Sequence, residues 1–333
     1  MILNPGVISL VGGSFLANLF MAYASWIGVR ILKEWDMESG SARQVILERK
    51  TYLVSTLLNV IMVYQIVSLF LLVHTADHIH TEFAGAMCAA GTLGANPYGY
   101  PALQVKVFAS FLCGIWLLVN RADGRAPDYP LIRVKYKLLP ALQVLFVLDL
   151  FLLWNYFGGL TPDVITSCCG ILFGDGDGSS AGELAHLPPE VMRVVFFAST
   201  FVLFRLGVHF MVTGRGAAAC ALAGIWLTGV SLSSILSFIS LYLYQMPSHH
   251  CPFCILQNEY GYVGYPLYLS WLVLGIFSAG MWVLERFRRI PSLQQVIPAA
   301  QRGYCVISLA AAGVFLLIAA YPMIFKGFRL GGY

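Results

Sequence analysis

Long apolar stretches separated by short polar segments dominate the pattern of this chain. A helix needs about 20 mostly apolar residues to cross a bilayer. Stretches of that kind cover about residues 7–29, 52–73, 102–119, 138–158, 191–212, 217–244, 263–284 and 304–325. The pattern predicts an all-α integral membrane protein with eight transmembrane helices.

The composition agrees with this class and the basic residues suggest an orientation. Of the 333 residues, 59% are hydrophobic and 11% are charged, against about 45–50% and about 25% in soluble domains. Lys and Arg concentrate in cytoplasmic loops, and here the segments 30–51 and 120–137 each hold five of them, whereas 74–101, 159–190 and 245–262 hold none. We therefore expect both termini and these three segments on the outer face. The net charge of +4 follows from this topology, so it gives no reason to expect a nucleic-acid partner.

The loops divide the sequence into two regions. Residues 1–137 form a three-helix N-terminal region with the outer loop 74–101, and residues 138–333 form a five-helix region with the outer loops 159–190 and 245–262. Two segments of the sequence also resemble each other, because each runs from a cysteine to a Gly-Tyr-Pro sequence at the start of a span. The first runs from Cys88 to Gly99-Tyr100-Pro101 and the second from Cys254 to Gly264-Tyr265-Pro266. Because these segments hold the same place in each half, they favour two four-helix halves, as in many transporters.

The strongest chemical motif is His249-His250-Cys251-Pro252-Phe253-Cys254, between two apolar stretches. A Cys-x-x-Cys pair can close a disulfide ring or supply half of a metal site. Cys88, Cys168 and Cys169 are also expected on the outer face, where disulfides persist. The sequence therefore predicts redox or metal chemistry beside the membrane.

Histidines keep the metal alternative open. His249 and His250 precede the cysteine pair directly, and His74 and His78 lie four residues apart at the end of the second span. Residues four apart share a helix face, which suits metal or haem ligation. Hydrogen bonding at the membrane surface is the other interpretation of these side chains.

Part of the chain resembles a known family. The motifs are Asp163-Val164, then Ser167-Cys168-Cys169-Gly170-Ile171-Leu172-Phe173, and, after two helices, Cys251-Pro252-Phe253-Cys254. Over about residues 138–285 they resemble vitamin K epoxide reductase and the bacterial disulfide-forming membrane oxidoreductases. The resemblance implies a four-helix bundle with a quinone beside the Cys-x-x-Cys, a secreted or periplasmic thiol protein as partner, and a bacterial inner-membrane location.

Site residues follow from that resemblance. It implies that Cys251 and Cys254 face the quinone and that Cys169 or Cys168 is the shuttle thiol. The family has two spaced loop cysteines, whereas this pair is adjacent, and Cys88 is one candidate for the missing partner.

Residues near the pair could serve a quinone. Tyr260 and Tyr265 could line its pocket or belong to the aromatic belt of the membrane surface. Glu259 could relay a proton or form a surface hydrogen bond. Within the spans, Asp149 and Arg205 are costly to bury alone, and we expect them to form a structural ion pair or part of a proton path.

Two functional hypotheses follow from the sequence. The first is a membrane thiol-disulfide oxidoreductase that exchanges electrons between outer cysteines and a quinone. The alternative is a non-catalytic membrane subunit, or a metal- or haem-binding protein, of a respiratory or export complex, in which the cysteines are structural disulfides or ligands.

Overall fold

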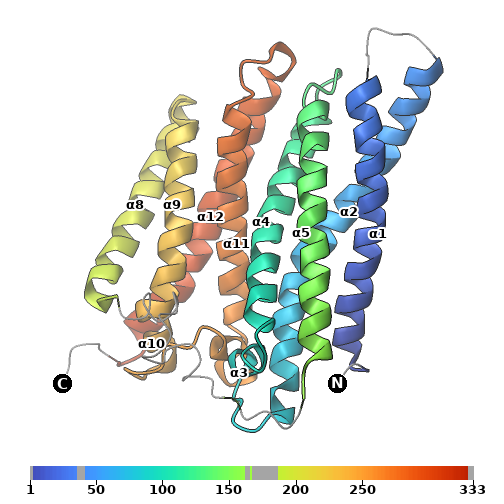
Figure 1. The fold of residues 1–333 in the computed structure, drawn as a ribbon. Helices are drawn as coiled ribbons and strands as arrows, with labels where there is room; N and C mark the ends of the chain where they lie inside the picture. The colour runs from blue at the N-terminus through green and yellow to red at the C-terminus, as the bar shows by residue number, and fades with distance from the viewer. Residues whose placement is uncertain (1–2, 36–41, 162–165, 167–186, 329–333) are drawn as a thin grey trace. The chain divides into compact units, whose positions relative to one another are not determined.

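The fold is all-helical in the part of the chain that the structure describes. The structure, a computed structural model, describes residues 3–35, 42–161, 166 and 187–328, and these contain no strand. Within these described residues, eight helices are long and apolar enough to cross a membrane, and Figure 1 shows how they are arranged along the chain. The chain is an integral membrane protein with lipid-facing helices, as predicted from the apolar stretches. The orientation of the chain in the membrane, with both termini on the outer face, stays a prediction.

The helices that contain the spans have the following bounds: α1 (Pro5–Glu34), α2 (Ala42–His78), α4 (Gly99–Asp123), α5 (Ile132–Gly158), α8 (Pro189–Thr213), α9 (Ala217–Ser234), α10 (Ser240–Tyr244), α11 (Gly264–Glu285) and α12 (Val296–Phe325). The π-helical turn η2 (Ile235–Ile239) joins α9 to α10 in one span. Shorter helical segments are η1 (Ile79–Glu82), α3 (Ala89–Leu93), η3 (Cys254–Leu256), η4 (Asn258–Tyr260) and η5 (Pro291–Leu293).

The chain forms two compact units. Unit 1 comprises Met1–Thr75, Asn96–Thr161 and Arg286–Ala300, and unit 2 comprises Ala76–Ala95, Pro162–Glu285 and Gln301–Tyr333. The first four spans thus gather mainly in unit 1 and the last four mainly in unit 2, as expected for two four-helix halves. Whether the halves are repeats stays a prediction, as does the regional boundary at residue 137.

Unit 1 is built on α5, which packs along α1 and α4. Its apolar core includes Met21, Leu58, Trp116 and Phe146, all buried. Close approach between α1 and α2 depends on Gly13, because a Cβ there would lie 2.2 Å from the hydroxyl oxygen of Tyr64.

Two buried ion pairs join α4 to α5 within unit 1. Lys135 Nζ lies 2.6 Å from Asp123 Oδ2, and Lys106 Nζ lies 2.9 Å from Asp149 Oδ2. The expected pairing of Asp149 with Arg205 is therefore wrong. The neighbouring helix α4 supplies the cation for Asp149, whereas Arg205 on α8 is exposed.

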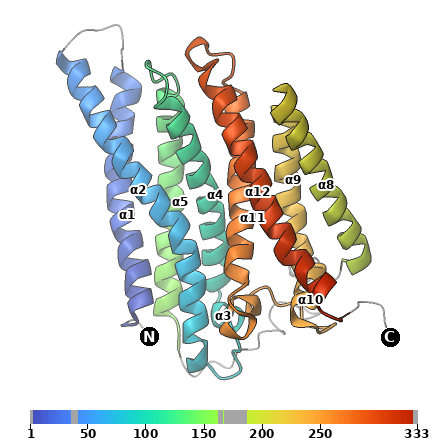
Figure 2. The same cartoon turned by 180° about the vertical axis from the view of Figure 1, so that it is seen from behind.

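Unit 2 is organised around α9, which packs on both α8 and α11. Figure 2 shows α12 running obliquely beside these helices. Where α9 meets α11, Gly224 permits contact with Ser278, since a Cβ at residue 224 would lie 2.1 Å from the serine hydroxyl oxygen. The span that begins with α9 ends at Tyr244, and the next residue, Gln245, has a positive φ of 58° and turns the chain into the segment carrying the Cys-x-x-Cys.

Candidate functional site

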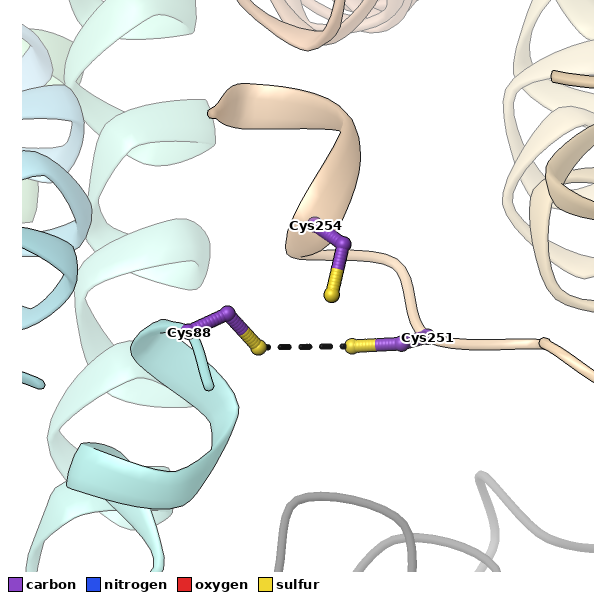
Figure 3. A group of neighbouring side chains, drawn as sticks. All are labelled: Cys88, Cys251 and Cys254. Atoms are coloured by element: carbon purple, nitrogen blue, oxygen red, sulfur yellow. Dashed lines mark hydrogen bonds between the residues drawn. The ribbon is translucent and has the colours of Figure 1, made fainter. Parts of the chain in front are cut away.

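Three cysteines from two distant segments of unit 2 form one cluster. Cys88 directly precedes α3, Cys251 lies in the segment between α10 and η3, and Cys254 is the first residue of η3. Cys88 Sγ lies 3.6 Å from Cys251 Sγ, and all three sulfur atoms lie within 4.8 Å of one another. Figure 3 shows the three side chains converging. We call Cys88, Cys251 and Cys254 the cysteine cluster.

The cysteine cluster is buried. The exposed fractions of Cys88, Cys251 and Cys254 are 0%, 1% and 7%. No disulfide bond joins Cys88, Cys251 and Cys254 in the structure. A shielded sulfur reacts first with the groups already packed beside it, which here are the other two sulfurs.

Two tyrosines hold the backbone of the Cys-x-x-Cys segment. The Tyr244 hydroxyl group donates to the carbonyl oxygen of Cys251 and accepts from the backbone N–H of Ile255 at 3.0 Å. The Tyr268 hydroxyl group of α11 donates to the carbonyl oxygen of Pro252 at 2.7 Å. These three hydrogen bonds fix the turn on both sides of the pair.

A second set of contacts holds Cys88 against this turn. Asp77 Oδ1 accepts from the backbone N–H of Ala89 and from Gln257 Nε2, each at 3.1 Å. Gln257 Nε2 also donates to the carbonyl oxygen of Met87 at 2.8 Å. Because Met87 and Ala89 flank Cys88, Gln257 and Asp77 connect the Cys88 segment to the residues that follow Cys254.

The cluster stabilises a thiolate at Cys251. Hydrogen bonds from the Cys254 and Cys88 thiols lower the pKa of Cys251 to about 3, and the backbone N–H groups of Phe253 and Cys254 contribute, although burial opposes the shift. The thiolate is the nucleophile in disulfide exchange and the form that binds metals. Burial and the nearby charge of Cys254 raise the pKa of Tyr260, with smaller contributions from Glu259 and Cys251.

The predicted histidines lie outside the cysteine cluster. His249 stacks edge-on against Tyr244 with ring centroids 4.4 Å apart, and His250 Nδ1 is hydrogen-bonded to the carbonyl oxygen of Leu236 at 2.7 Å. His74 and His78 are exposed on α2. In the described part of the chain, the cysteine cluster is the one group of three or more Cys, His, Asp or Glu residues close enough to share a metal ion.

The remaining predicted residues are placed only in part. Cys168 and Cys169 lie outside the described residues. The nearby Thr166 is buried, and its backbone N–H donates to the carbonyl oxygen of Ala84 at 3.0 Å, four residues before Cys88. Tyr260 packs edge-on against Tyr244 with centroids 4.8 Å apart. Glu259 is exposed.

Sequence inspection missed the residues that position the cluster. Asp77 stands beside the histidines singled out as metal ligands, and Gln257 lies three residues after Cys254. The available signal was weak, because Asp77 lies eleven residues before Cys88. It did not show that the two side chains bond to each other across 180 residues of sequence.

Comparison with known proteins identifies no relative. No protein-family model, no curated protein and no solved structure matches this chain. The function must therefore be argued from the site.

Chemically, three converging thiols support two kinds of reaction. A third sulfur beside a Cys-x-x-Cys pair can exchange with its disulfide through a mixed-disulfide intermediate. Three thiolates can also bind a soft metal ion.

Proposed function

We propose that this protein is a membrane thiol-disulfide oxidoreductase in which Cys88 exchanges with the Cys251–Cys254 pair. The observation that carries the proposal is the 3.6 Å separation of Cys88 Sγ and Cys251 Sγ, with Cys254 Sγ within 4.8 Å of both. Cys88 Sγ needs to move less than 2 Å toward Cys251 Sγ to reach the S–S bond length of about 2.05 Å.

The proposed reaction consists of two thiol–disulfide exchange steps, and each step forms one S–S bond and breaks one. When Cys251 and Cys254 form a disulfide, the Cys88 thiolate attacks Cys251 Sγ, so the Cys88–Cys251 bond forms and Cys254 leaves as a thiolate. A thiolate from Cys168 or Cys169 then attacks Cys88 Sγ and releases Cys251 as the second thiolate. The bond between Cys88 and the loop cysteine has then replaced the original disulfide, and the Cys251–Cys254 dithiol holds two electrons.

A membrane quinone is the electron acceptor in this proposal. The dithiol delivers two electrons and two protons to the quinone, which becomes a quinol, and the Cys251–Cys254 disulfide forms again. Tyr260, Tyr265 and Glu259 are the proposed quinone contacts, supported by their position after Cys254 and by the family resemblance. A secreted or periplasmic thiol protein is the proposed reductant of the loop cysteines, on the outer face of a bacterial inner membrane.

Trapping of the intermediate tests the exchange. The Cys254→Ser variant lacks the leaving thiol that would resolve a Cys88–Cys251 bond, so mild oxidation should link Cys88 to Cys251, as peptide mass mapping would show. Cys113→Ser is the matched control, because Cys113 is also buried but belongs to unit 1, whereas the cysteine cluster belongs to unit 2.

Two results would refute the proposal. One is the absence of a Cys88–Cys251 link in oxidised Cys254→Ser protein. The other is a wild-type Cys251–Cys254 pair that stays in one redox state whichever quinone, quinol or reductant is supplied to reconstituted protein, as scored by thiol alkylation.

A trithiolate metal site is the second candidate function, favoured by the mutual distances of the three sulfurs. Zinc–sulfur bonds of about 2.3 Å in tetrahedral geometry separate two sulfurs by about 3.8 Å, close to the observed 3.6 Å. Metal analysis of anaerobically purified protein decides between the two functions. Stoichiometric zinc or copper that is lost on Cys88→Ser would favour a metal-binding subunit, whereas metal-free protein that cycles between dithiol and disulfide favours the oxidoreductase.

A further inference from the structure

Unit 1 contains an apolar pocket between the first turns of α1 and the last turns of α5. Its volume is about 250 Å³. The residues that line it are Val7, Ile8, Val11 and Gly12 of α1 and Trp154, Phe157 and Gly158 of α5. Because α1 begins at Pro5 and α5 ends at Gly158, the pocket lies at one end of these two spans. We call it the α1–α5 pocket.

The α1–α5 pocket is open toward the membrane and closed toward the interior of unit 1. Ile8 and Trp154 are 53% and 68% exposed, whereas Val7 and Phe157 are each 3% exposed. Further along the two helices, Asn18 of α1 donates to a backbone carbonyl group of α5 at 2.9 Å. The helices are therefore in direct contact beyond the pocket, and the exposed side chains at its edge belong to the surface that contacts lipid.

Two glycines keep this space open although the protein does not need them for packing. A Cβ at Gly12 or at Gly158 would meet no neighbouring atom within 4 Å. The adjacent Gly13 differs, because a Cβ there would collide with the Tyr64 side chain. Glycine in the interior of a helix is less stabilising than alanine, so the absence of a side chain at Gly12 indicates that a group from outside the chain uses this space.

A hydrocarbon chain from the membrane fits the α1–α5 pocket better than water or a whole ligand does. Buried water needs two to four polar partners, and apolar cavities without such partners stay dry and bind apolar molecules. The volume of about 250 Å³ lies below the about 300–1,000 Å³ of pockets that enclose a drug-sized ligand. The pocket therefore takes one part of a larger molecule, and lipid acyl chains already lie beside its open side.

The sequence around this end of α1 and α5 indicates the class of headgroup. Anionic lipids are recognised by clusters of Lys and Arg near the membrane surface. Residues 1–29 and 150–161, which include every residue that lines the pocket, contain no charged side chain. Trp154 is of a residue type that is enriched at the membrane–water interface. These features favour a lipid whose headgroup carries no net charge.

We propose that the α1–α5 pocket binds one acyl chain of a phospholipid without net charge, and that this lipid stays bound when the surrounding bilayer is removed. The chain packs against the backbone at Gly12 and Gly158, where no side chain of the protein fills the space. Its headgroup lies at the ends of α1 and α5. The site involves no cysteine, so it is independent of the proposed thiol-disulfide exchange.

Native mass spectrometry of the full chain tests this site. The detergent-solubilised protein is given equal amounts of phosphatidylethanolamine and phosphatidylglycerol with the same acyl chains. The wild type should retain one phospholipid, and that lipid should be phosphatidylethanolamine. Gly12→Leu places a side chain in the pocket and should lose the lipid. Gly229→Leu, at an exposed glycine of α9 with open space around its Cβ, is the matched control and should retain it.

Tryptophan fluorescence locates the retained lipid. Bromine atoms on an acyl chain quench a tryptophan that they contact. One equivalent of brominated phosphatidylethanolamine, added to delipidated protein, should quench the wild type more strongly than Trp154→Phe. In Gly12→Leu the quenching should fall to the level of Trp154→Phe, because the chain is excluded from the pocket.

The outcomes separate a bound lipid from the other occupants of an apolar pocket. Wild-type protein that retains no lipid, or that prefers phosphatidylglycerol, overturns the proposal, as does equal retention in the wild type and Gly12→Leu. A quinone retained in place of the phospholipid, or a wild-type dimer that Gly12→Leu dissociates, assigns the pocket to another occupant and also overturns it. If Gly12→Leu does not fold, Gly158→Leu replaces it, since it fills the same space from α5.

Discussion

Replacement of Tyr244 by phenylalanine should loosen the Cys-x-x-Cys segment without removing any group that bonds to sulfur. The change leaves the ring in place and deletes one hydroxyl group, which serves the carbonyl oxygen of Cys251 and the N–H of Ile255. Both groups belong to residues that are at most 1% exposed. The variant thus leaves one acceptor and one donor unpaired in the native segment, whereas local opening allows both to bond with water.

The structure gives a magnitude for this effect. Each unpaired buried group costs about 1–3 kcal/mol, so two of them should lower the free energy of local opening by about 2–6 kcal/mol. Because about 1.4 kcal/mol corresponds to tenfold, opening should increase at least about 30-fold. Tyr268→Phe is the matched control: it removes one hydrogen bond, to the carbonyl oxygen of the half-buried Pro252, and should increase opening less than Tyr244→Phe does, because water can reach that carbonyl group more easily.

Alkylation kinetics measure this opening. Reduced protein is treated with a maleimide under native conditions, and mass spectrometry follows the labelling rates of Cys251 and Cys254. When closing is faster than labelling, the rate is proportional to the open population. Labelling of Cys113 in unit 1 should not change and reports any global unfolding. Equal rates in Tyr244→Phe and wild-type protein, or a larger effect of Tyr268→Phe, would refute the assigned role of Tyr244.

Three further predictions test other parts of the structure. The thiolate absorbance of reduced protein should persist from neutral pH down to about pH 3 and be lost in Cys251→Ser. Because the pKa of Cys251 in the folded protein lies below the unfolded value of about 8.5, the thiolate contributes its full stabilisation above that unfolded value, and this stabilisation is lost as the pH falls through the folded pKa. A titration midpoint near the unfolded value would contradict the prediction. Gly224→Ala should destabilise unit 2 by about 1–3 kcal/mol through overpacking, whereas Gly229→Ala on the same helix, with open space around its Cβ, should not lower the unfolding temperature. Cys220 on α9 and Cys305 on α12, with sulfurs 3.7 Å apart, should form a disulfide with a two-electron oxidant, and failure to find the linked peptide would contradict the closeness of these two side chains.

The sequence predicted the spans closely because apolar length encodes them directly. Its errors occurred where charged residues lie inside helices. The fourth span was expected to begin at residue 138, but α5 begins at Ile132. Arg133, Lys135 and Lys137 precede the apolar run but lie inside the helix, and the side chain of Lys135 is buried against Asp123.

The partner of Asp149 could not be deduced from depth in the membrane alone. Arg205 was chosen because a helical rise of about 1.5 Å per residue places it at a similar depth. Depth does not tell which helices are neighbours, and Lys106 lies on the helix that packs against α5. A single Lys within the apolar stretch 102–119 was visible in the sequence, and the rarity of such residues in spans was reason to consider it.

The cysteine cluster shows the same limit. Cys88, Cys251 and Cys254 were each named as candidate site residues, and Cys88 was one candidate partner for Cys168 or Cys169, which lie outside the described residues. The contact of Cys88 with Cys251, 163 residues away in sequence, was not foreseen. The hydrogen bond between Asp77 and Gln257 joins the same two segments, and no local pattern encodes a hydrogen bond between two distant side chains.

Cys88 therefore separates the two proposed functions better than the Cys-x-x-Cys pair does. If the cluster exchanges disulfides, Cys88→Ser should leave Cys251 and Cys254 able to cycle with a quinone and should block only electron entry from the thiol substrate. If the cluster binds a metal ion, the same variant removes one of three ligands. Cys251 and Cys254 alone should then no longer hold the ion. Replacing Cys251 disables both functions alike, because that residue is both the sulfur attacked by Cys88 and a metal ligand. The position of the third sulfur, which sequence patterns could not supply, is thus the feature that makes the function testable.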